Sequence, residues 1–234
     1  MSHLHLPDGV LPPAVWIAGA LLAAFALALS LVATRGESAQ RLALRGALGG
    51  IMLAVMAIPV PITAFDYCMT LAGPVGVLLG AAGAFQVAFV VTLILALMGQ
   101  GGFTVVGLNT LVLGAGAALA RPLYVALVRR LAPAPSMALA TAVSQLASSA
   151  LWLAVLAVSV RLAPGASHDH EFAHAIAWLR GGTIAVVLLP LLALAIGIES
   201  LLGYGLAAFL ARVRPDLLPQ APGEPAPLAR GAKP

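Results

Sequence analysis

The sequence predicts an all-α, polytopic integral membrane protein with about seven transmembrane segments, its N-terminus outside and its C-terminus cytoplasmic. Three observations predict this class. Of the 234 residues, 62% are hydrophobic and only 9% are charged. Uncharged apolar stretches recur along the chain, and most are as long as the roughly 20 residues that a helix needs to cross a bilayer. Most arginines fall on one predicted side of the membrane.

The same composition excludes two other classes. A soluble globular domain is about half apolar and about a quarter charged, and a disordered chain needs low hydrophobicity with high net charge. Twelve Lys and Arg against eight Asp and Glu give a net charge of only +4. These charges form no basic stripe interleaved with aromatic residues, so no nucleic-acid partner is expected. The single cysteine, Cys68, excludes an internal disulfide and a multi-cysteine zinc site.

Five uncharged runs outline the segments, at residues 9–34, 46–65, 67–120, 131–160 and 181–198. The first, second and fourth runs are each expected to hold one helix. The last predicted helix covers about 178–211, which is longer than a bilayer requires. The first run has Asp8 and no Lys or Arg before it and is too long for the apolar part of a signal peptide, so this segment is expected to be retained.

The run 67–120 must hold more than one helix, and its breakers indicate where to divide it. Gly73-Pro74 favours the start of a helix. Gly80 and Gly83 indicate a tight turn or a close helix contact, and the stretch 99–102 is the strongest breaker. The sequence therefore predicts helices near 73–82, 84–98 and 104–128.

The placement of arginines predicts the orientation. Groups that follow the first, fifth and seventh segments fall on one side, namely Arg35, Arg41 and Arg45, then Arg129 and Arg130, then Arg212 and Arg214. The positive-inside rule makes this side cytoplasmic, in a multi-pass protein of a bacterial inner membrane. Residues 1–214 are expected to form a single transmembrane domain, and residues 215–234, rich in Pro, Ala and Gly, a disordered cytoplasmic tail.

All five histidines fall on the predicted outer side, namely His3, His5, His168, His170 and His174. Imidazole is a ligand for transition metals, so this clustering indicates metal contact. At the N-terminus, a free amine, the next amide and an imidazole can form chelate rings around Ni(II) or Cu(II). Ser2 and His3 supply this set if Met1 is removed; the alternative is that His3 and His5 belong to a mobile tail.

Three stretches carry a resemblance to a known family. They are His5-Leu6-Pro7-Asp8-Gly9-Val10-Leu11-Pro12-Pro13, then Gly101-Gly102-Phe103-Thr104-Val105-Val106-Gly107-Leu108-Asn109-Thr110, then Ala195-Ile196-Gly197-Ile198-Glu199 followed by Leu201-Leu202. The first is similar to the start, and the others to internal segments, of the CbiM/NikM family. These proteins are the membrane substrate-capture components of energy-coupling-factor cobalt and nickel transporters. The resemblance covers roughly residues 4–214.

The resemblance implies capture of Co²⁺ or Ni²⁺ from outside by an N-terminus threaded into the centre of the protein. The terminal amine, the second residue's amide and imidazole, and a histidine after the second helix would supply four nitrogens. His5 matches the family's N-terminal histidine, and Leu4 matches its initiating Met. Asp8 and Gly9 would let the N-terminus turn inward. The metal would be the substrate, used for cobalamin synthesis or a nickel enzyme, and no catalytic cofactor is expected.

This sequence departs from the family pattern twice. Because Met1-Ser2-His3 precede Leu4, either the ligand set shifts to Ser2 and His3 or the chain begins at position 4. No histidine stands near Tyr67, where the family's second histidine is expected. Asp66 or Cys68 is the candidate replacement, and a thiolate would favour softer ions. The alternatives are an acid that marks the membrane edge and a small buried thiol.

Energy coupling is expected to come from other chains. The sequence contains no Gly-x-x-x-x-Gly-Lys-(Ser/Thr) motif to cradle nucleotide phosphates. The expected partners are ATPase subunits and a membrane coupling subunit, with a small accessory membrane subunit as a further candidate. Asn109 and Glu199 are expected to have structural or coupling roles. For Glu199, an acid inside a membrane helix, a hydrogen bond in helix packing is an equal alternative.

A rival function comes from the loop His168-Asp169-His170-Glu171-Phe172-Ala173-His174, which contains a His-Glu-x-x-His motif. On a helix, His170 and His174 would share a face, and Glu171 would be the general base of a membrane-embedded zinc metallopeptidase. Glu199 lies about 37 Å further along a continuous helix, so a third ligand is lacking. We therefore expect no enzyme activity, and this loop is a candidate accessory metal site or a polar cap.

Overall fold

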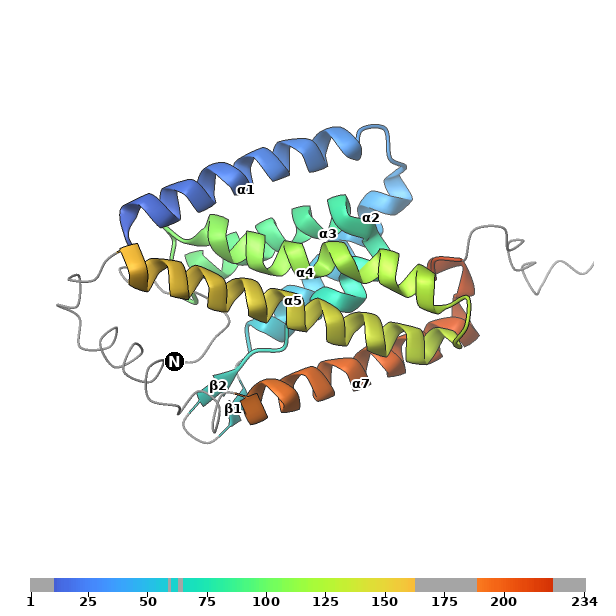
Figure 1. The fold of residues 1–234 in the computed structure, drawn as a ribbon. Coiled ribbons are helices and arrows are strands. Elements are labelled where there is room, and N and C mark those ends of the chain that lie inside the picture. The colour runs from blue at the N-terminus through green and yellow to red at the C-terminus, as the bar shows by residue number, and fades with distance from the viewer. Residues whose placement is uncertain (1–10, 59, 63–64, 163–188, 221–234) are drawn as a thin grey trace, which may run out of the picture.

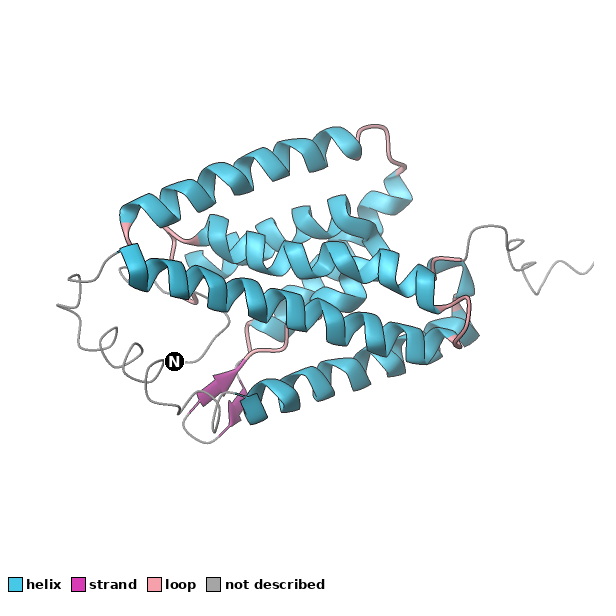
Figure 2. Cartoon of the chain, in the orientation of Figure 1, coloured by secondary structure: helices cyan, strands magenta, loops and turns pink. Residues whose placement is uncertain are grey.

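The computed structural model describes residues 11–58, 60–62, 65–162 and 189–220. These residues form six helices and a two-stranded hairpin (Figure 1, Figure 2). The elements are α1 (Pro13–Ala33), α2 (Ala39–Met56), β1 (Val60–Ile62), β2 (Phe65–Tyr67), α3 (Ala72–Leu97), α4 (Val106–Leu127), α5 (Pro133–Leu162), α7 (Leu189–Val213) and the 3₁₀ turn η2 (Pro215–Leu217). The predicted helical membrane class is confirmed, and the described residues add the hairpin to it.

Five helices are long and apolar enough to cross a membrane, namely α1, α3, α4, α5 and α7. In α3, 56% of the most apolar window is buried, against 17% in α1. Helix α3 therefore belongs to the interior, packed chiefly against α4. Helix α1 presents Leu21, Leu22 and Phe25 outward. In a bilayer such an apolar face contacts the acyl chains, while the helix satisfies its own backbone groups.

Helix α2 differs from the segment predicted within 46–65. It begins at Ala39, because the side chain of Ser38 caps it by accepting a hydrogen bond from the Arg41 amide at 3.4 Å. It ends at Met56, ahead of Pro59 and Pro61 in the sequence, where proline disfavours further helix. The predicted bounds were wrong because they treated charged residues as helix ends, whereas Arg41 and Arg45 lie inside this helix.

After α2 the chain forms the hairpin of β1 and β2. The strands are antiparallel, with Val60 opposite Tyr67, Pro61 opposite Asp66 and Ile62 opposite Phe65. The second half of the predicted segment is therefore extended rather than helical. Because a hairpin reverses the chain within a few residues, α3 can begin close to the point where α2 ends.

Helix α3 consists of two helical segments that meet at Gly80, which has φ 75° and ψ 174°. Close contacts with α4 give the direction of each segment: they join Gly76 to Ala117, Gly80 to Arg121, Phe85 to Gly114 and Thr92 to Thr110. The first segment thus runs parallel to α4 and the second antiparallel, so the chain reverses at Gly80. The break predicted from the sequence at residue 83 is confirmed, three residues earlier than expected, at Gly80.

The two ends of the bundle differ in charge. In Figure 1 the α1–α2 connection, the α4–α5 connection and the end of α7 lie at one end, and the start of α1, the end of α5 and the hairpin lie at the other. We call these the arginine-rich end and the hairpin end. Arg35, Arg129 and Arg214 belong to the first, and Arg161, in the last turn of α5, to the second. The cytoplasmic placement of the arginine-rich end stays a prediction.

The described C-terminal part extends further than expected. Of the predicted helix 178–211, residues 178–188 lie outside the described part, and α7 covers the rest to Val213. Ordered structure then continues past residue 214, because η2 packs back on the bundle and Leu218 is buried in the core with Tyr124 and Leu210. The remainder of the predicted tail, 221–234, lies outside the described residues.

Candidate metal-capture site

The last helix is hydrogen-bonded to the start of α3 through a buried acid. Glu199 of α7 and Thr70 are both essentially inaccessible to solvent. The Thr70 amide donates to Glu199 Oε1 at 2.8 Å, and Thr70 Oγ1 lies 3.1 Å from Oε2 and 3.3 Å from Oε1. A buried carboxyl group requires hydrogen-bond partners. Glu199 therefore ties α7 to the segment that leaves the hairpin.

The turn that Glu199 holds is strained. Leu71 has φ 52° and is the one non-glycine residue with a positive φ in the described part of the chain. This left-handed conformation costs about 1–2 kcal/mol for an L-residue. The Ala72 amide also donates to Thr70 Oγ1 at 3.3 Å. The contacts of Thr70 thus fix the abrupt change of direction from β2 into α3.

Two candidate ligands are attached to this turn. Cys68, two residues before Thr70, is buried and forms no disulfide. Asp66 lies in β2, opposite Pro61 in β1. The hairpin and the turn therefore bring both candidates to the same short segment at the hairpin end. Within the described ranges, however, no three His, Cys, Asp or Glu side chains gather in a group that could hold a metal ion.

A row of buried polar side chains on α5 was not anticipated from the sequence. Its members are each less than 5% exposed: Thr141, Ser144, Gln145, Ser148 and Ser149. The spacing i, i+3, i+4, i+7, i+8 is that of one helix face. All five residues lie within the uncharged run 131–160 of the sequence. This pattern was the available signal, because polar residues in a membrane helix face protein or a cavity.

The polar face of α5 lies beside the Thr70–Glu199 contact. A Cβ at Gly73 or Gly203 would approach Thr141 Oγ1 to 2.8 Å or 2.7 Å. Gly73 follows Thr70 by three residues, and Gly203 follows Glu199 by one helical turn. Oxygen atoms of Thr141, Ser144 and Gln145 make no hydrogen bond within the described part. Near Glu199, Thr141 is therefore a buried hydroxyl with hydrogen-bonding capacity to spare.

The start of α1 is packed at the same end of the bundle. Leu11, the first described residue, is 6% exposed and contacts Val105 and Leu108 at the beginning of α4. Trp16 and Trp152 pack against this cluster. The chain that precedes residue 11 is thus attached at the hairpin end, where Cys68 lies.

The sequence matches the family described as the cobalt uptake substrate-specific transmembrane region, over residues 5–217. The chain belongs to this family. A solved structure of a truncated transition metal transporter resembles it with a TM-score of 0.70 and 17% identity, over 89% of this chain and 99% of that one. At this identity the likeness concerns the fold. A search of the curated proteins finds none that matches.

Two of the sequence stretches that carry the resemblance to the cobalt-uptake family form contacts between helices. The stretch 101–110 forms the turn between α3 and α4 and the start of α4. In it, a Cβ at Gly107 would lie 2.6 Å from Ala20 Cα of α1, and Thr110 Oγ1 lies 2.8 Å from Thr92 Oγ1. Asn109 between them is 3% exposed. These residues bring α1, α3 and α4 into close contact. The other stretch places Glu199 against Thr70.

Most of the predicted ligands of this cobalt-uptake family member lie outside the described residues. These ligands are Ser2, His3 and His5 at the N-terminus and His168, His170 and His174 in the outer loop. Asp8 and Gly9, which are expected to have a structural role, also lie outside the described residues. Asp66 lies in β2 and Cys68 just after it, two residues apart in the sequence, and Asn109 is buried in α4. Thr70 was missed because its partner Glu199 is 129 residues away in the sequence.

Proposed function

We propose that this chain is the substrate-binding membrane component of an ATP-driven energy-coupling-factor transporter that takes up cobalt or nickel across a bacterial inner membrane. The observation that carries this proposal is the family match over residues 5–217. The fold likeness to a transition metal transporter supports it. The same match favours transport over a metallopeptidase that would use His170, Glu171 and His174.

The proposed metal ligands come from the N-terminus and the segment after β2. The amine of Ser2 with the imidazole of His3, or the imidazole of His5, would supply nitrogen donors, and Cys68 or Asp66 would complete the set. The chain from His3 to Leu11 can extend about 25 Å, whereas packed helices lie about 8–10 Å apart. The proposed site requires this segment to run from its anchor at Leu11 to Cys68.

The turn at Thr70 supports a capture role for Cys68. A ligand must be held in place if a site is to select one metal geometry over another. Glu199 supplies this support from α7, acting on Thr70 two residues from the thiol. We propose Glu199 as a structural residue of the site rather than a ligand, together with Asn109, which is buried in α4.

Partners would supply the energy. Because the chain has no phosphate-cradling motif, ATP would be hydrolysed by separate ATPase subunits and the work transmitted by a membrane coupling subunit, with a small accessory membrane subunit as a further candidate. In this scheme the hairpin end faces outward and collects the metal. Reorientation of the whole subunit in the membrane would then deliver the metal to the cytoplasmic side.

The test of the site uses Co²⁺ as a spectroscopic probe with purified full-length protein. A thiolate bound to Co²⁺ adds a sulfur-to-metal charge-transfer band in the near ultraviolet. We expect His3→Ala combined with His5→Ala to abolish cobalt binding, and Cys68→Ser to remove this band while the nitrogen-ligand field bands remain. Asp66→Asn serves as the matched variant that distinguishes the two candidates.

A control addresses the outer loop. The triple variant His168→Ala, His170→Ala and His174→Ala removes three imidazoles from the chain, one more than the double variant at His3 and His5. We expect it to retain cobalt binding of unchanged stoichiometry. Unchanged metal content in the N-terminal histidine variant, or loss confined to the loop variant, would overturn the proposed site.

A further inference from the structure

A cavity of about 650 Å³ opens at the arginine-rich end. It lies between α2, the Gly80 reversal of α3, α4 and η2, far along the helices from Cys68. Its charged lining consists of Arg41, Arg45, Arg121, Arg214, Glu37 and Asp216. Four positive and two negative side chains therefore face one space.

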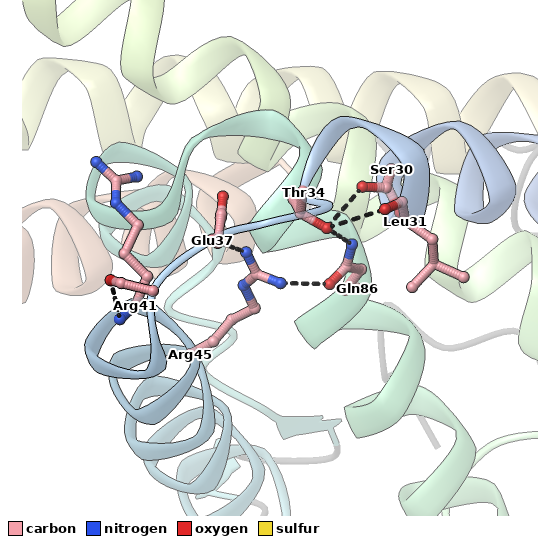
Figure 3. A network of polar contacts seen from close by, with 8 residues as sticks. Ser30, Leu31, Thr34, Glu37, Arg41, Arg45 and Gln86 are labelled. Atoms are coloured by element: carbon pink, nitrogen blue, oxygen red, sulfur yellow. Dashed lines mark hydrogen bonds and ion pairs between the residues drawn. The ribbon is translucent and has the colours of Figure 1, made fainter.

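Two of the four arginines are neutralised by acids in the same cavity. Arg45 pairs with Glu37 and donates to Gln86 Oε1 at 2.6 Å, as Figure 3 shows. Arg214 Nη2 lies 2.8 Å from Asp216 Oδ2. The hydrogen bond from Arg214 lowers the pKa of the Asp216 carboxyl, so this pair is fully ionised at neutral pH.

The guanidinium groups of Arg41 and Arg121 have no acid partner in the described part of the chain. In Figure 3 the Arg41 side chain extends away from the Arg45–Glu37 pair. Arg121 lies over the Gly80 turn, where a Cβ at residue 80 would be 3.2 Å from its Nη1. Arg121 is partly buried and is repelled by Arg41. Like charges that share a partly buried space are unfavourable without an anion between them.

Beside the charged groups, the lining contains two polar residues, Ser38 and Gln40, and an apolar part that favours a lipid over a free ion. Leu44, Leu78, Leu79 and Leu217 border the same cavity. The cavity also lies at the helix ends, where lipid headgroups meet a membrane protein, and basic pockets between membrane helices bind anionic headgroups. A phosphodiester with attached hydrocarbon chains satisfies the arginines and the leucines together.

We propose that this cavity binds an anionic phospholipid, whose phosphodiester group lies between Arg41 and Arg121. Guanidinium groups bind phosphate oxygens in pairs. The lipid would join α2 to the Gly80 reversal and to α4, three elements that meet around the cavity. This inference concerns the arginine-rich end alone and does not depend on metal capture at the hairpin end.

The experiment measures lipid-dependent stability of purified full-length protein in a neutral detergent. The midpoint of thermal unfolding is followed while phosphatidylglycerol, phosphatidylcholine with the same acyl chains, or inorganic phosphate is added. We expect phosphatidylglycerol alone to raise the midpoint saturably. Arg41→Gln and Arg121→Gln should each weaken the apparent affinity for phosphatidylglycerol roughly tenfold, as expected for loss of a charged hydrogen bond.

The matched control is Arg130→Gln, because Arg130 is exposed at the same end and does not line the cavity. It should respond to phosphatidylglycerol as the unmodified protein does. Since Arg41 is exposed, Arg41→Gln tests the proposal even if Arg121→Gln fails to fold. The proposal is overturned if both lipids stabilise equally, if Arg41→Gln behaves like the control, or if phosphatidylglycerol has no effect. Equal stabilisation by inorganic phosphate would mean that the cavity binds a free anion and would also overturn the proposal of a lipid.

Discussion

At the scale of single residues, the most informative contact joins Glu199 to Thr70. A carboxylate at zero exposure in a membrane helix is costly unless donors surround it. Here the backbone amide and the hydroxyl of one residue both point at it. The result is a link across 129 residues of sequence that holds the strained turn at Leu71. Sequence reasoning offered a helix-packing hydrogen bond as one of two roles for Glu199.

The first prediction concerns Glu199→Ala. This change leaves the Thr70 amide buried without an acceptor, so we expect a loss of about 2–3 kcal/mol in the free energy of unfolding. Glu199→Gln keeps an acceptor oxygen and should cost less. Thermal unfolding in detergent measures the effect. The control is Asp216→Ala, an exposed acid in a surface pair, which should change stability little. Equal effects of Glu199→Ala and Asp216→Ala would refute the role given to Glu199.

At the scale of the elements, helix boundaries were harder to predict than helix breaks. Glycine at residue 80 adopts a φ of 75°, a conformation that glycine accepts without strain, so its place in the sequence was a usable signal. The start of α2 had no such signal in the sequence. An uncharged run indicates the part of a helix that contacts lipid, whereas the helix itself can include charged residues when their side chains have partners. Arg45 is partly buried against Gln86 and Glu37, and the apolar runs of the sequence do not indicate these partners.

The second prediction concerns the reversal in α3. Gly80→Ala forces a side chain into a positive φ and places its Cβ 3.2 Å from Arg121 Nη1, so we expect destabilisation of about 1–2 kcal/mol. Gly50→Ala is the control. Gly50 lies inside α2, and nothing stands within 4 Å of its Cβ position. Alanine there should leave stability unchanged or raise it by up to about 1 kcal/mol. The same response to both substitutions in thermal unfolding would contradict the reversal.

At the scale of the whole molecule, the bundle has two chemically different ends. The hairpin end carries Cys68 and the anchor of the N-terminus at Leu11, and the arginine-rich end carries a basic cavity. The class of fold and the separation of charge followed from composition and spacing, because a bilayer imposes both. The hairpin did not, since three-residue strands leave little periodic signal; the polar face of α5 was visible in the spacing of its residues, but the spacing does not tell which helix that face contacts.

The third prediction concerns orientation. In a Cys68→Ser background, Arg130→Cys places a thiol at the arginine-rich end, and Ser167→Cys places one on the predicted outer loop. The positive-inside rule predicts that a membrane-impermeant maleimide labels the second variant in intact cells and the first only after the membrane is opened. Labelling in the reverse order would invert the proposed direction of transport.

The central claim, capture of cobalt or nickel, is tested most directly by equilibrium metal binding to the purified full-length chain. The protein is dialysed in parallel against Co²⁺, Ni²⁺ and Mg²⁺ at equal free concentration, and bound metal is measured per chain. Nitrogen and sulfur donors favour the transition metals strongly over Mg²⁺. We expect close to one Co²⁺ or Ni²⁺ per chain and no bound Mg²⁺. Absence of both transition metals, or equal uptake of all three ions, would contradict it.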